Sequence, residues 1–241
     1  MKLSIIIPAF NEEQLLGETL RQVHAAGASL AARNWDSEII VCDNNSSDRT
    51  AEIARNGGAT VVFEPVNQIA RARNTGAAAA TGEWLLFIDA DSHPSAALFA
   101  DVVAAIESGR WIAGGARIRL ESGYPLGSAV TWMWNQVSRW RRLLAGSFIF
   151  CDAQAFRSVG GFSSELFAGE ELDLSLRLQS VARTQGRGIT ILQRHPLVTS
   201  ARKLRLYSGR EHLRFLWRVL TNHRASLRDR AACHQWYDGR R

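Results

Sequence analysis

The feature that most limits how this chain can fold is a regular alternation of short apolar runs with helical patterns in residues 1–90. The apolar runs, which we expect to be strands, are residues 3–8, 37–42, 59–63 and 83–89. They are apolar at successive positions, as is typical of strands buried on both faces of a parallel sheet. The helical patterns between them run from 12 to about 28, from 48 to 56 and from 70 to 80. This alternation predicts βαβ units and an α/β fold, with a mostly parallel central sheet flanked by helices.

The second half of the chain is less regular. Within residues 124–146, Met133, Val137, Trp140 and Leu144 lie on one helical stripe. We expect the tryptophans at 132–140 to lie in the core or along the wall of the acceptor pocket. Residues 146–152 predict a further strand, and residues 169–183 a helix with three carboxylates in its first turn. There is neither an internal repeat nor a clear linker, so we expect a single domain.

The composition favours a cytoplasmic globular protein. Hydrophobic residues make up 46% and charged residues 22% of the chain, which is ordinary for a globular domain. Cys42, Cys151 and Cys233 are too far apart for a zinc-ligand pattern, and we expect them to be reduced thiols. The apolar run before Pro8 is too short for a signal peptide, and no stretch of about 18 apolar residues predicts a membrane span.

The basic character of the chain is concentrated at its end. Residues 201–241 contain 11 Lys and Arg against 3 Asp and Glu, although the whole chain has a net charge of only +6. The amphipathic part of this tail, residues 203–224, can lie at the inner face of an anionic membrane, or pack on the core or on a second subunit of a homodimer. The tail has no nucleic-acid-binding motif, so we expect no nucleic-acid partner.

Polar residues follow three of the expected strands. Asn11 and Glu12 follow the first, Asp43 ends the second, and Asp89 and Asp91 follow the fourth. In an open parallel sheet the carboxyl ends of strands form the ligand-binding crevice, so we expect these side chains to converge. Each of them, taken alone, could equally be a helix cap or a turn residue.

The pair Asp89 and Asp91 fits a divalent cation. Two carboxylates so close together repel each other unless a positive charge lies between them, and Mg²⁺ and Mn²⁺ prefer oxygen ligands. The alternative is that one of the aspartates caps a helix that begins near Pro94.

Several motifs together resemble those of family 2 glycosyltransferases, which have the GT-A fold. The motifs are SIIIPAFNEE, DNNSSDRTAEIA, ARNTGAAAATGEWLLFIDADS, FRSVGGF and GEELDLSLRL, in this order over about residues 3–182. The resemblance implies a GT-A catalytic domain over residues 1–200, with a nucleotide- and metal-binding half over about 1–100 and an acceptor half over about 101–200. The basic tail then covers residues 201–241.

The resemblance also implies roles in binding the donor. Pro8, Ala9, Asn11 and Glu12 match the loop that lines the nucleotide pocket of the family, and Asp43 matches the residue that hydrogen-bonds the base, usually uracil.

Further along the chain, Arg73 and Asn74 match a segment beside the nucleotide. Asp89 and Asp91 match the pair that holds Mn²⁺ or Mg²⁺ against the diphosphate of the nucleotide-sugar. This match agrees with the chemistry, because the departing diphosphate needs its charge neutralised and the chain has no glycine-rich phosphate loop.

The first turn of the expected helix at 169–183 matches the catalytic base of the family. Inverting members usually have the Asp of a Glu-Asp pair there, whereas this chain has Glu170-Glu171, with Glu171 at the base position. The base is therefore Glu171, Glu170 or neither, and the departure also leaves open whether configuration is inverted or retained. Asp173 and Arg177 are expected to form an i, i+4 ion pair.

The segment after this helix resembles one that contributes a third ligand in some relatives. His195 is the candidate metal ligand, and a solvated loop histidine is the alternative. Arg202 and Lys203 are candidates for contact with the diphosphate or with an anionic acceptor.

These residues together predict a metal-dependent glycosyltransferase of hexosyltransferase type. It would move a sugar from a nucleotide-sugar, expected to be a UDP-sugar, to the hydroxyl of a carbohydrate, lipid-linked or small phosphorylated acceptor, with inversion. A sugar-phosphate nucleotidyltransferase is a rival, but residues 8–13 lack the glycine and basic residues that it would need. A degenerate GT-A protein that binds a nucleotide without transferring a sugar is the second rival.

Overall fold

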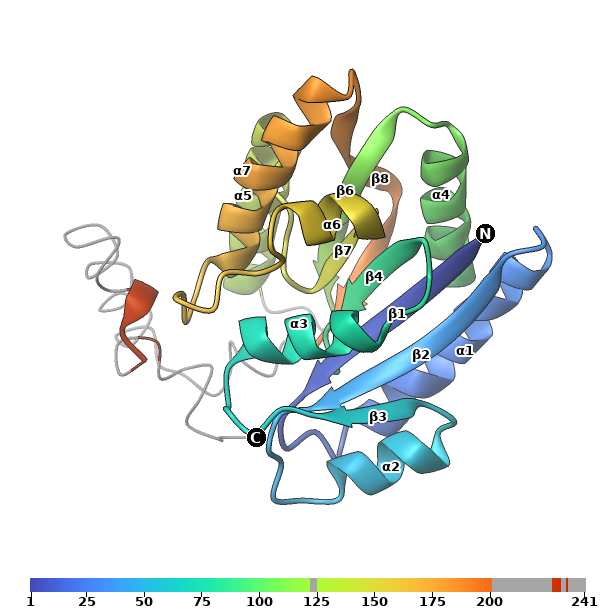
Figure 1. The fold of residues 1–241 in the computed structure, drawn as a ribbon, viewed down its shortest axis with the longest axis vertical. Coiled ribbons are helices and arrows are strands. Elements are labelled where there is room, and N and C mark those ends of the chain that lie inside the picture. Colours follow the sequence, from blue (N-terminus) through green and yellow to red (C-terminus); the bar gives the residue numbers. More distant parts are fainter. Residues whose placement is uncertain (122–124, 201–226, 231–232, 234–241) are drawn as a thin grey trace.

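A computed structural model describes residues 1–121, 125–200, 227–230 and 233 (Figure 1). The strands in this part of the chain are β1 (Lys2–Ala9), β2 (Asp36–Asp43), β3 (Thr60–Phe63), β4 (Trp84–Ile88), β5 (Ser92–His93), β6 (Trp111–Leu120), β7 (Phe148–Asp152) and β8 (Gly188–Thr199). The helices are α1 (Leu16–Ala31), α2 (Thr50–Asn56), α3 (Ile69–Ala79), α4 (Ala96–Glu107), α5 (Pro125–Arg141), α6 (Ala153–Ser158) and α7 (Glu170–Thr184).

One sheet holds all of these strands, in the order β3-β2-β1-β4-β7-β6-β8-β5. Strands β1 to β4 pair in parallel, β7 runs antiparallel between β4 and β6, and β8 is parallel to β6. The short β5 pairs antiparallel with β8. The predicted mostly parallel α/β sheet is therefore confirmed, and its fold is GT-A.

Two hydrophobic layers form because the strands place alternate side chains on opposite faces of the sheet. Leu3, Ile5 and Ile7 of β1 belong to the layer that includes α1 and α4, whereas Ile6 belongs to the layer that includes α3, α6 and α7. Figure 1 shows the helices covering the sheet in these two groups. The continuous apolar runs of the sequence thus reflect burial on both faces.

The predicted strands and helices of the first half are confirmed, with small shifts at their ends. The helix predicted from residue 12 begins at Leu16, because the carbonyl of Glu12 first accepts hydrogen bonds from the backbone N–H groups of Leu15 and Leu16 in a turn. Helix α2 ends at Asn56, where Gly57 and Gly58 follow and Gly58 has a φ of 76°.

The stripe predicted on helix α5 is not part of the core. Met133, Val137 and Trp140 are 58%, 40% and 79% exposed, and only Leu144, beyond the end of the helix, is buried. The core interpretation is wrong for Trp132 and Trp140, which are 64% and 79% exposed, because polar contacts of Asn135 with β6 orient the helix against the sheet. Trp134 of the same helix does line a cavity, which agrees with the pocket-wall alternative for that one residue.

The basic tail is described only in part. Its predicted amphipathic segment, 203–224, and the candidates Arg202 and Lys203 lie outside the described residues. Leu227 accepts a hydrogen bond through its carbonyl from Phe167 N–H at 2.7 Å, and Arg228 lies 2.6 Å from Glu165. No helix in the described part of the chain has the length and apolar character to cross a membrane.

Candidate active site

The carboxyl ends of β1, β2 and β4 lie side by side, because β1 pairs in parallel with both neighbours. The backbone N–H of Asn44, just after β2, donates to the carbonyl of Ala9 at 2.8 Å. The hydroxyl of Thr19 on α1 donates to the carbonyl of Ala90 at 2.7 Å, which anchors the turn that follows β4. The polar strand ends are thus brought to one edge of the sheet, as predicted.

The first group of candidate residues closes β1 and β2. Pro8 and Ala9 are the last residues of β1, and Ala9 is the register partner of Asp43. Asp43 is 7% exposed, and its carboxylate accepts a hydrogen bond from Ser46 N–H at 3.0 Å. The carboxylate is thereby held at the end of the strand next to the β1 loop.

The loop after β1 is tied to the loop after β2. Asn11 adopts a left-handed conformation, with a φ of 52°, and its N–H donates to Ser46 Oγ at 3.0 Å. The buried Glu12 donates through its N–H to Thr50 Oγ1 at 2.8 Å. These contacts fix the shape of the edge at which a nucleotide is expected.

Asp89 and Asp91 are not helix caps. Helix α4 begins at Ala96, and its cap is Ser95, whose hydroxyl oxygen accepts a hydrogen bond from Leu98 N–H at 3.2 Å. Asp91 is only 5% exposed, and none of the ion pairs among the described residues includes its carboxylate. A largely buried carboxylate without a cationic side chain beside it fits a metal ion supplied with the substrate.

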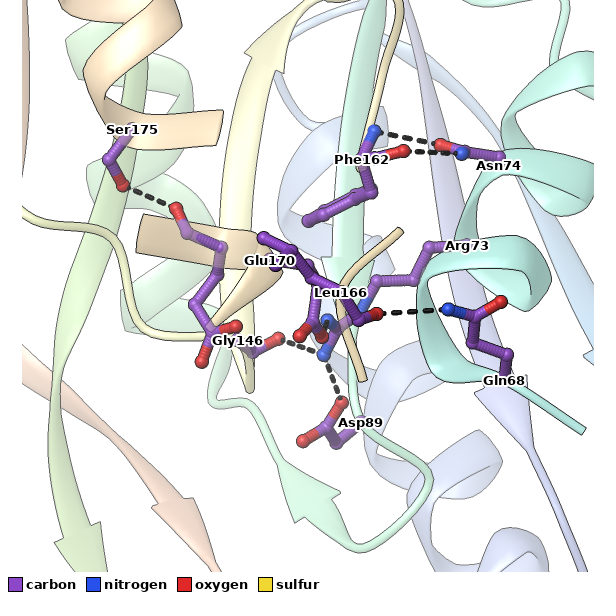
Figure 2. A network of polar contacts seen from close by, with 10 residues as sticks. Gln68, Arg73, Asn74, Asp89, Gly146, Phe162, Leu166, Glu170 and Ser175 are labelled. Carbon is purple, nitrogen blue, oxygen red and sulfur yellow. Dashed lines mark hydrogen bonds and ion pairs between the residues drawn. The ribbon is translucent and has the colours of Figure 1, made fainter. Parts of the chain in front are cut away.

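Arg73 is the centre of the polar network (Figure 2). Its side chain, 2% exposed, donates from Nη1 to Glu170 at 2.7 Å and from Nη2 to Asp89 at 3.0 Å and to the carbonyl of Gly146 at 2.9 Å. Nε is buried without a hydrogen-bond partner among the described residues. Arg73 thereby joins the end of β4 to the first turn of α7.

Glu171 lies beside this network at the start of α7. Burial, and after it the neighbouring Glu170, raise the pKa of its carboxyl to about 8 against the opposing effect of Arg73. A Cβ atom at Gly146 would lie 2.9 Å from Arg73 Nη2 and 3.4 Å from Glu171 Oε1, so the glycine leaves space for both groups. The carboxyl of Glu171 is thus a weaker acid than an ordinary glutamate, because its pKa is raised.

A cavity of about 260 Å³ opens onto these groups. The residues that line it are Ile69, Arg73, Asp89, Ile118, Trp134, Ala145, Gly146, Ser147, Phe167, Ala168, Gly169, Glu170 and Glu171. The metal candidate Asp89 and the two base candidates therefore share one cavity, although they are more than 80 residues apart in the sequence.

Two side chains of the α3 segment hold the loop between α6 and α7. Asn74 exchanges hydrogen bonds with the backbone of Phe162, donating to its carbonyl at 2.8 Å and accepting from its N–H at 2.9 Å (Figure 2). Gln68 donates to the carbonyls of Ser164 and Leu166 at 2.8 and 2.9 Å. Asn74, expected beside the nucleotide, thus uses its side chain to position this loop.

The structure does not bring His195 to the aspartates. His195 lies within β8 rather than in a loop, and its Nδ1 is 2.9 Å from Asp101 on α4. No three His, Cys, Asp or Glu side chains gather as a metal site anywhere in the described ranges. The contact with Asp101 gives the His195 ring a partner on α4, and its role as a third ligand of the Asp89 and Asp91 pair stays a prediction.

Two residues that shape the site, Gln68 and Gly146, were not predicted from the sequence. Gln68 precedes an expected helix and looked like an ordinary polar residue, whereas Gly146 looked like the first residue of a strand. A signal for Gly146 was its position two residues before β7. Because β7 pairs with β4, this position places the backbone of Gly146 near Asp89.

Comparison with known proteins finds similar sequences among glycosyltransferases. The model of the family described as Glycosyl transferase family 2 matches residues 4–163. The uncharacterised glycosyltransferase Rv0539 of Mycobacterium tuberculosis is 33% identical over 114 residues, covering 47% of this chain and 48% of that protein. The undecaprenyl-phosphate 4-deoxy-4-formamido-L-arabinose transferase of Pseudomonas fluorescens is 33% identical over 122 residues, covering 47% and 35%. The chain thus spans about half or less of the length of these curated relatives.

A solved structure with a similar fold is the glucosyl-3-phosphoglycerate synthase from Mycobacterium tuberculosis in complex with Mn²⁺, UDP-glucose and phosphoglyceric acid. The TM-score is 0.62 at 18% sequence identity, over 97% of this chain and 80% of that one. At this identity the similarity establishes the fold alone.

Proposed function

This chain belongs to glycosyl transferase family 2, and we propose that it transfers a sugar from a UDP-sugar to an acceptor hydroxyl, with inversion at the anomeric carbon and with a divalent cation. The observation that carries the proposal is the network around Arg73, which brings Asp89 and the Glu170–Glu171 pair to one cavity. A transferase needs such a combination, because the departing diphosphate requires stabilisation of its negative charge and the attacking hydroxyl requires a base that accepts its proton.

Asp89 and Asp91 are the proposed ligands of Mn²⁺ or Mg²⁺. The fit rests on the largely buried carboxylate of Asp91, which has no ion-pair partner within the described residues, and on the partly exposed Asp89 at the cavity. Two protein carboxylates leave room for water and diphosphate oxygens as the other ligands. When bound, the cation supplies electrostatic stabilisation of the diphosphate as the sugar departs.

Glu171 is the proposed general base. The acceptor oxygen forms a bond to the anomeric carbon while the bond from that carbon to the diphosphate oxygen breaks, and the electron pair leaves with the nucleoside diphosphate. The proton of the acceptor hydroxyl passes to Glu171, whose raised pKa of about 8 makes its ionised form a stronger base than an ordinary carboxylate. Glu170 is less suited, since it is 5% exposed and ion-paired with Arg73 at 2.7 Å.

Pro8, Ala9, Asn11, Glu12 and Asp43 are the proposed nucleotide-binding residues. This role is supported by the position of the five residues at the carboxyl ends of β1 and β2, on the same edge of the sheet as Asp89. In open α/β sheets nucleotides bind at this edge. Arg73 and Asn74 are proposed to act indirectly, by holding Asp89, Glu170 and the loop at Phe162 in place.

The proposal is tested by incubating the full chain with UDP-sugars and GDP-sugars in turn and measuring release of the nucleoside diphosphate. We expect release from a UDP-sugar in the presence of Mn²⁺, loss of that release in EDTA, and its recovery when Mn²⁺ is added back. An NMR spectrum of the product would then show inverted anomeric configuration. Release of pyrophosphate from a nucleoside triphosphate and a sugar phosphate would instead identify a nucleotidyltransferase, and turnover of none of these substrates would indicate a degenerate protein.

A further inference from the structure

Helix α5 packs with its polar side inward. The amide of Asn135 exchanges two hydrogen bonds with the backbone of Ile118 on β6, accepting from its N–H at 3.0 Å and donating to its carbonyl at 2.9 Å. Ser138, 3% exposed, donates to the carbonyl of Leu143 at 2.7 Å. These contacts determine the rotation of the helix about its own axis.

The opposite side of α5 exposes large apolar side chains. Val130, Trp132, Met133, Val137 and Trp140 are 51%, 64%, 58%, 40% and 79% exposed. At about 100° per residue they fall within one arc of less than half the helix circumference. We call these five residues the α5 face. An ordinary surface helix has the reverse arrangement, with its apolar stripe toward the core.

Positive charge accompanies the α5 face. Arg139, Arg141 and Arg142 follow one another at the end of the helix, and residues 125–142 contain neither Asp nor Glu. The guanidinium carbon of Arg141 lies 5.5 Å from the centre of the Trp140 ring. Tryptophan and arginine side by side are typical of helices that lie at a membrane interface, where the ring sits at headgroup level and the cation meets phosphate.

A basic groove of about 300 Å³ borders the α5 face. Its lining includes Arg117 and Arg119 of β6, and Arg139 and Trp132 of α5. Trp132 belongs to both features, so apolar and cationic contacts are offered by one continuous surface. The facing leaflet of an anionic membrane offers a partner for each kind of contact, because its headgroups attract arginine and its acyl chains accept apolar side chains.

We propose that the α5 face and its groove dock on an anionic phospholipid surface. A second copy of the chain is the weaker occupant, because a two-fold interface on this face would cover the arginines of both copies without any acidic residue on α5 to pair with them. The proposal stands apart from the transfer reaction, since docking needs neither donor nor metal. It would place the cavity beside the lipid surface, because Trp134 of the same helix lines that cavity.

The test measures flotation of the full chain with vesicles of phosphatidylcholine, with and without phosphatidylglycerol. We expect binding only to the vesicles that contain phosphatidylglycerol. The combined variant Trp132→Ser, Met133→Ser and Trp140→Ser should bind at least about 10-fold more weakly, because binding strength scales with the apolar area inserted. The control Leu176→Ser, which changes a 61% exposed leucine on α7, should bind like the unaltered chain.

The charge contribution is tested separately. Changing Arg139, Arg141 and Arg142 to Gln should weaken binding on the order of 100-fold, at about 1 kcal/mol for each arginine near the surface. A control with the same change in net charge alters three exposed arginines on other helices, namely Arg21, Arg55 and Arg183. This control should change vesicle binding far less. Because the basic residues of the tail are the same in both variants, the tail cannot account for the difference.

A fluorescent label measures whether the α5 face inserts into the lipid surface. The three native cysteines are buried, so Met133→Cys can be labelled selectively with an environment-sensitive dye, with Leu176→Cys as the control. An increase in fluorescence with anionic vesicles at position 133 alone would support the proposal. Equal binding of the α5 variants and the unaltered chain would overturn it, as would a dimer in sedimentation velocity that is lost in the apolar variant.

Discussion

Replacing Arg73 with methionine is expected to lower the free energy of unfolding by about 3–5 kcal/mol, the cost typical of removing one partner from a buried ion pair. Arg73 is 2% exposed and contacts Asp89 and Glu170 at 3.0 and 2.7 Å, with Glu171 beside them. Without the guanidinium, these carboxylates repel one another inside the protein, and the carbonyl of Gly146 also loses its donor. Urea denaturation at neutral pH would measure the loss.

The matched control for this change lies on the same helix. Arg71→Met also removes an ion pair, with Glu64 at 3.0 Å, but Arg71 is 41% exposed, so the expected loss is below about 1 kcal/mol. Adding Glu170→Gln to Arg73→Met should recover part of the lost stability, because one of the unpaired charges is then removed. Equal effects of Arg73→Met and Arg71→Met would show that the network contributes little to the fold.

Replacing Glu171 with glutamine is expected to lower kcat by about 10²- to 10⁴-fold, the range for loss of a general base. The carboxyl has to be ionised to accept a proton, and its pKa is raised to about 8. We therefore expect kcat/KM of the unaltered chain to rise as the pH increases through about 8 and to level off above it. Glu171→Gln should lose this pH dependence along with the activity.

The same group links stability to pH. A carboxyl whose pKa is raised from 4.5 to about 8 on folding binds its proton more tightly in the folded chain than in the unfolded one. Its contribution to the free energy of unfolding is therefore greatest below pH 4.5 and is lost as the pH rises toward 8. Glu171→Gln should remove this decline, which can be followed by denaturation at a series of pH values.

Two neighbouring carboxylates serve as controls for Glu171. Asp173→Asn, in the same helical turn, disrupts only the ion pair with Arg177 at 2.5 Å, so activity should be nearly unchanged. Glu170→Gln should reduce activity through the position of Arg73, and the rise of kcat/KM should remain but move to lower pH, because Glu170 helps to raise the pKa of Glu171. Loss of that pH dependence in Glu170→Gln, with its survival in Glu171→Gln, would transfer the role of base to Glu170.

Much of the fold was predictable because it follows from local patterns. Continuous apolar runs such as residues 3–8 and 83–89, alternating with helical patterns, indicate strands covered on both faces, and β1 and β4 are such strands. The convergence of Asp43 and Asp89 then follows from parallel pairing, since parallel neighbours end at the same edge. The pair Asp173 and Arg177 was predictable for a similar reason, because both lie on one turn of a helix.

The rest depends on contacts between distant segments. The sequence suggested that Arg73 lies near the nucleotide, but its position between Asp89 and Glu170 depends on the packing of α7 against the sheet. The outward rotation of α5 depends on the pairing of Asn135 with the backbone of Ile118, and this contact opposes the usual rule that the apolar side of a helix is the covered one. His195 was expected as a metal ligand or as a solvated loop histidine, whereas it lies in β8 next to Asp101.

The most direct test of a metal-assisted donor site is calorimetric titration of UDP into the unaltered chain and into Asp91→Asn, each with and without Mn²⁺. Asp91→Asn keeps the shape of the side chain and removes its charge, and Asp36→Asn, at the exposed start of β2, is the matched control. We expect UDP to bind the unaltered chain and the control only with Mn²⁺, and Asp91→Asn to lose that binding. Binding of UDP that ignores both Mn²⁺ and the change at Asp91 would contradict the proposed role of the aspartate pair.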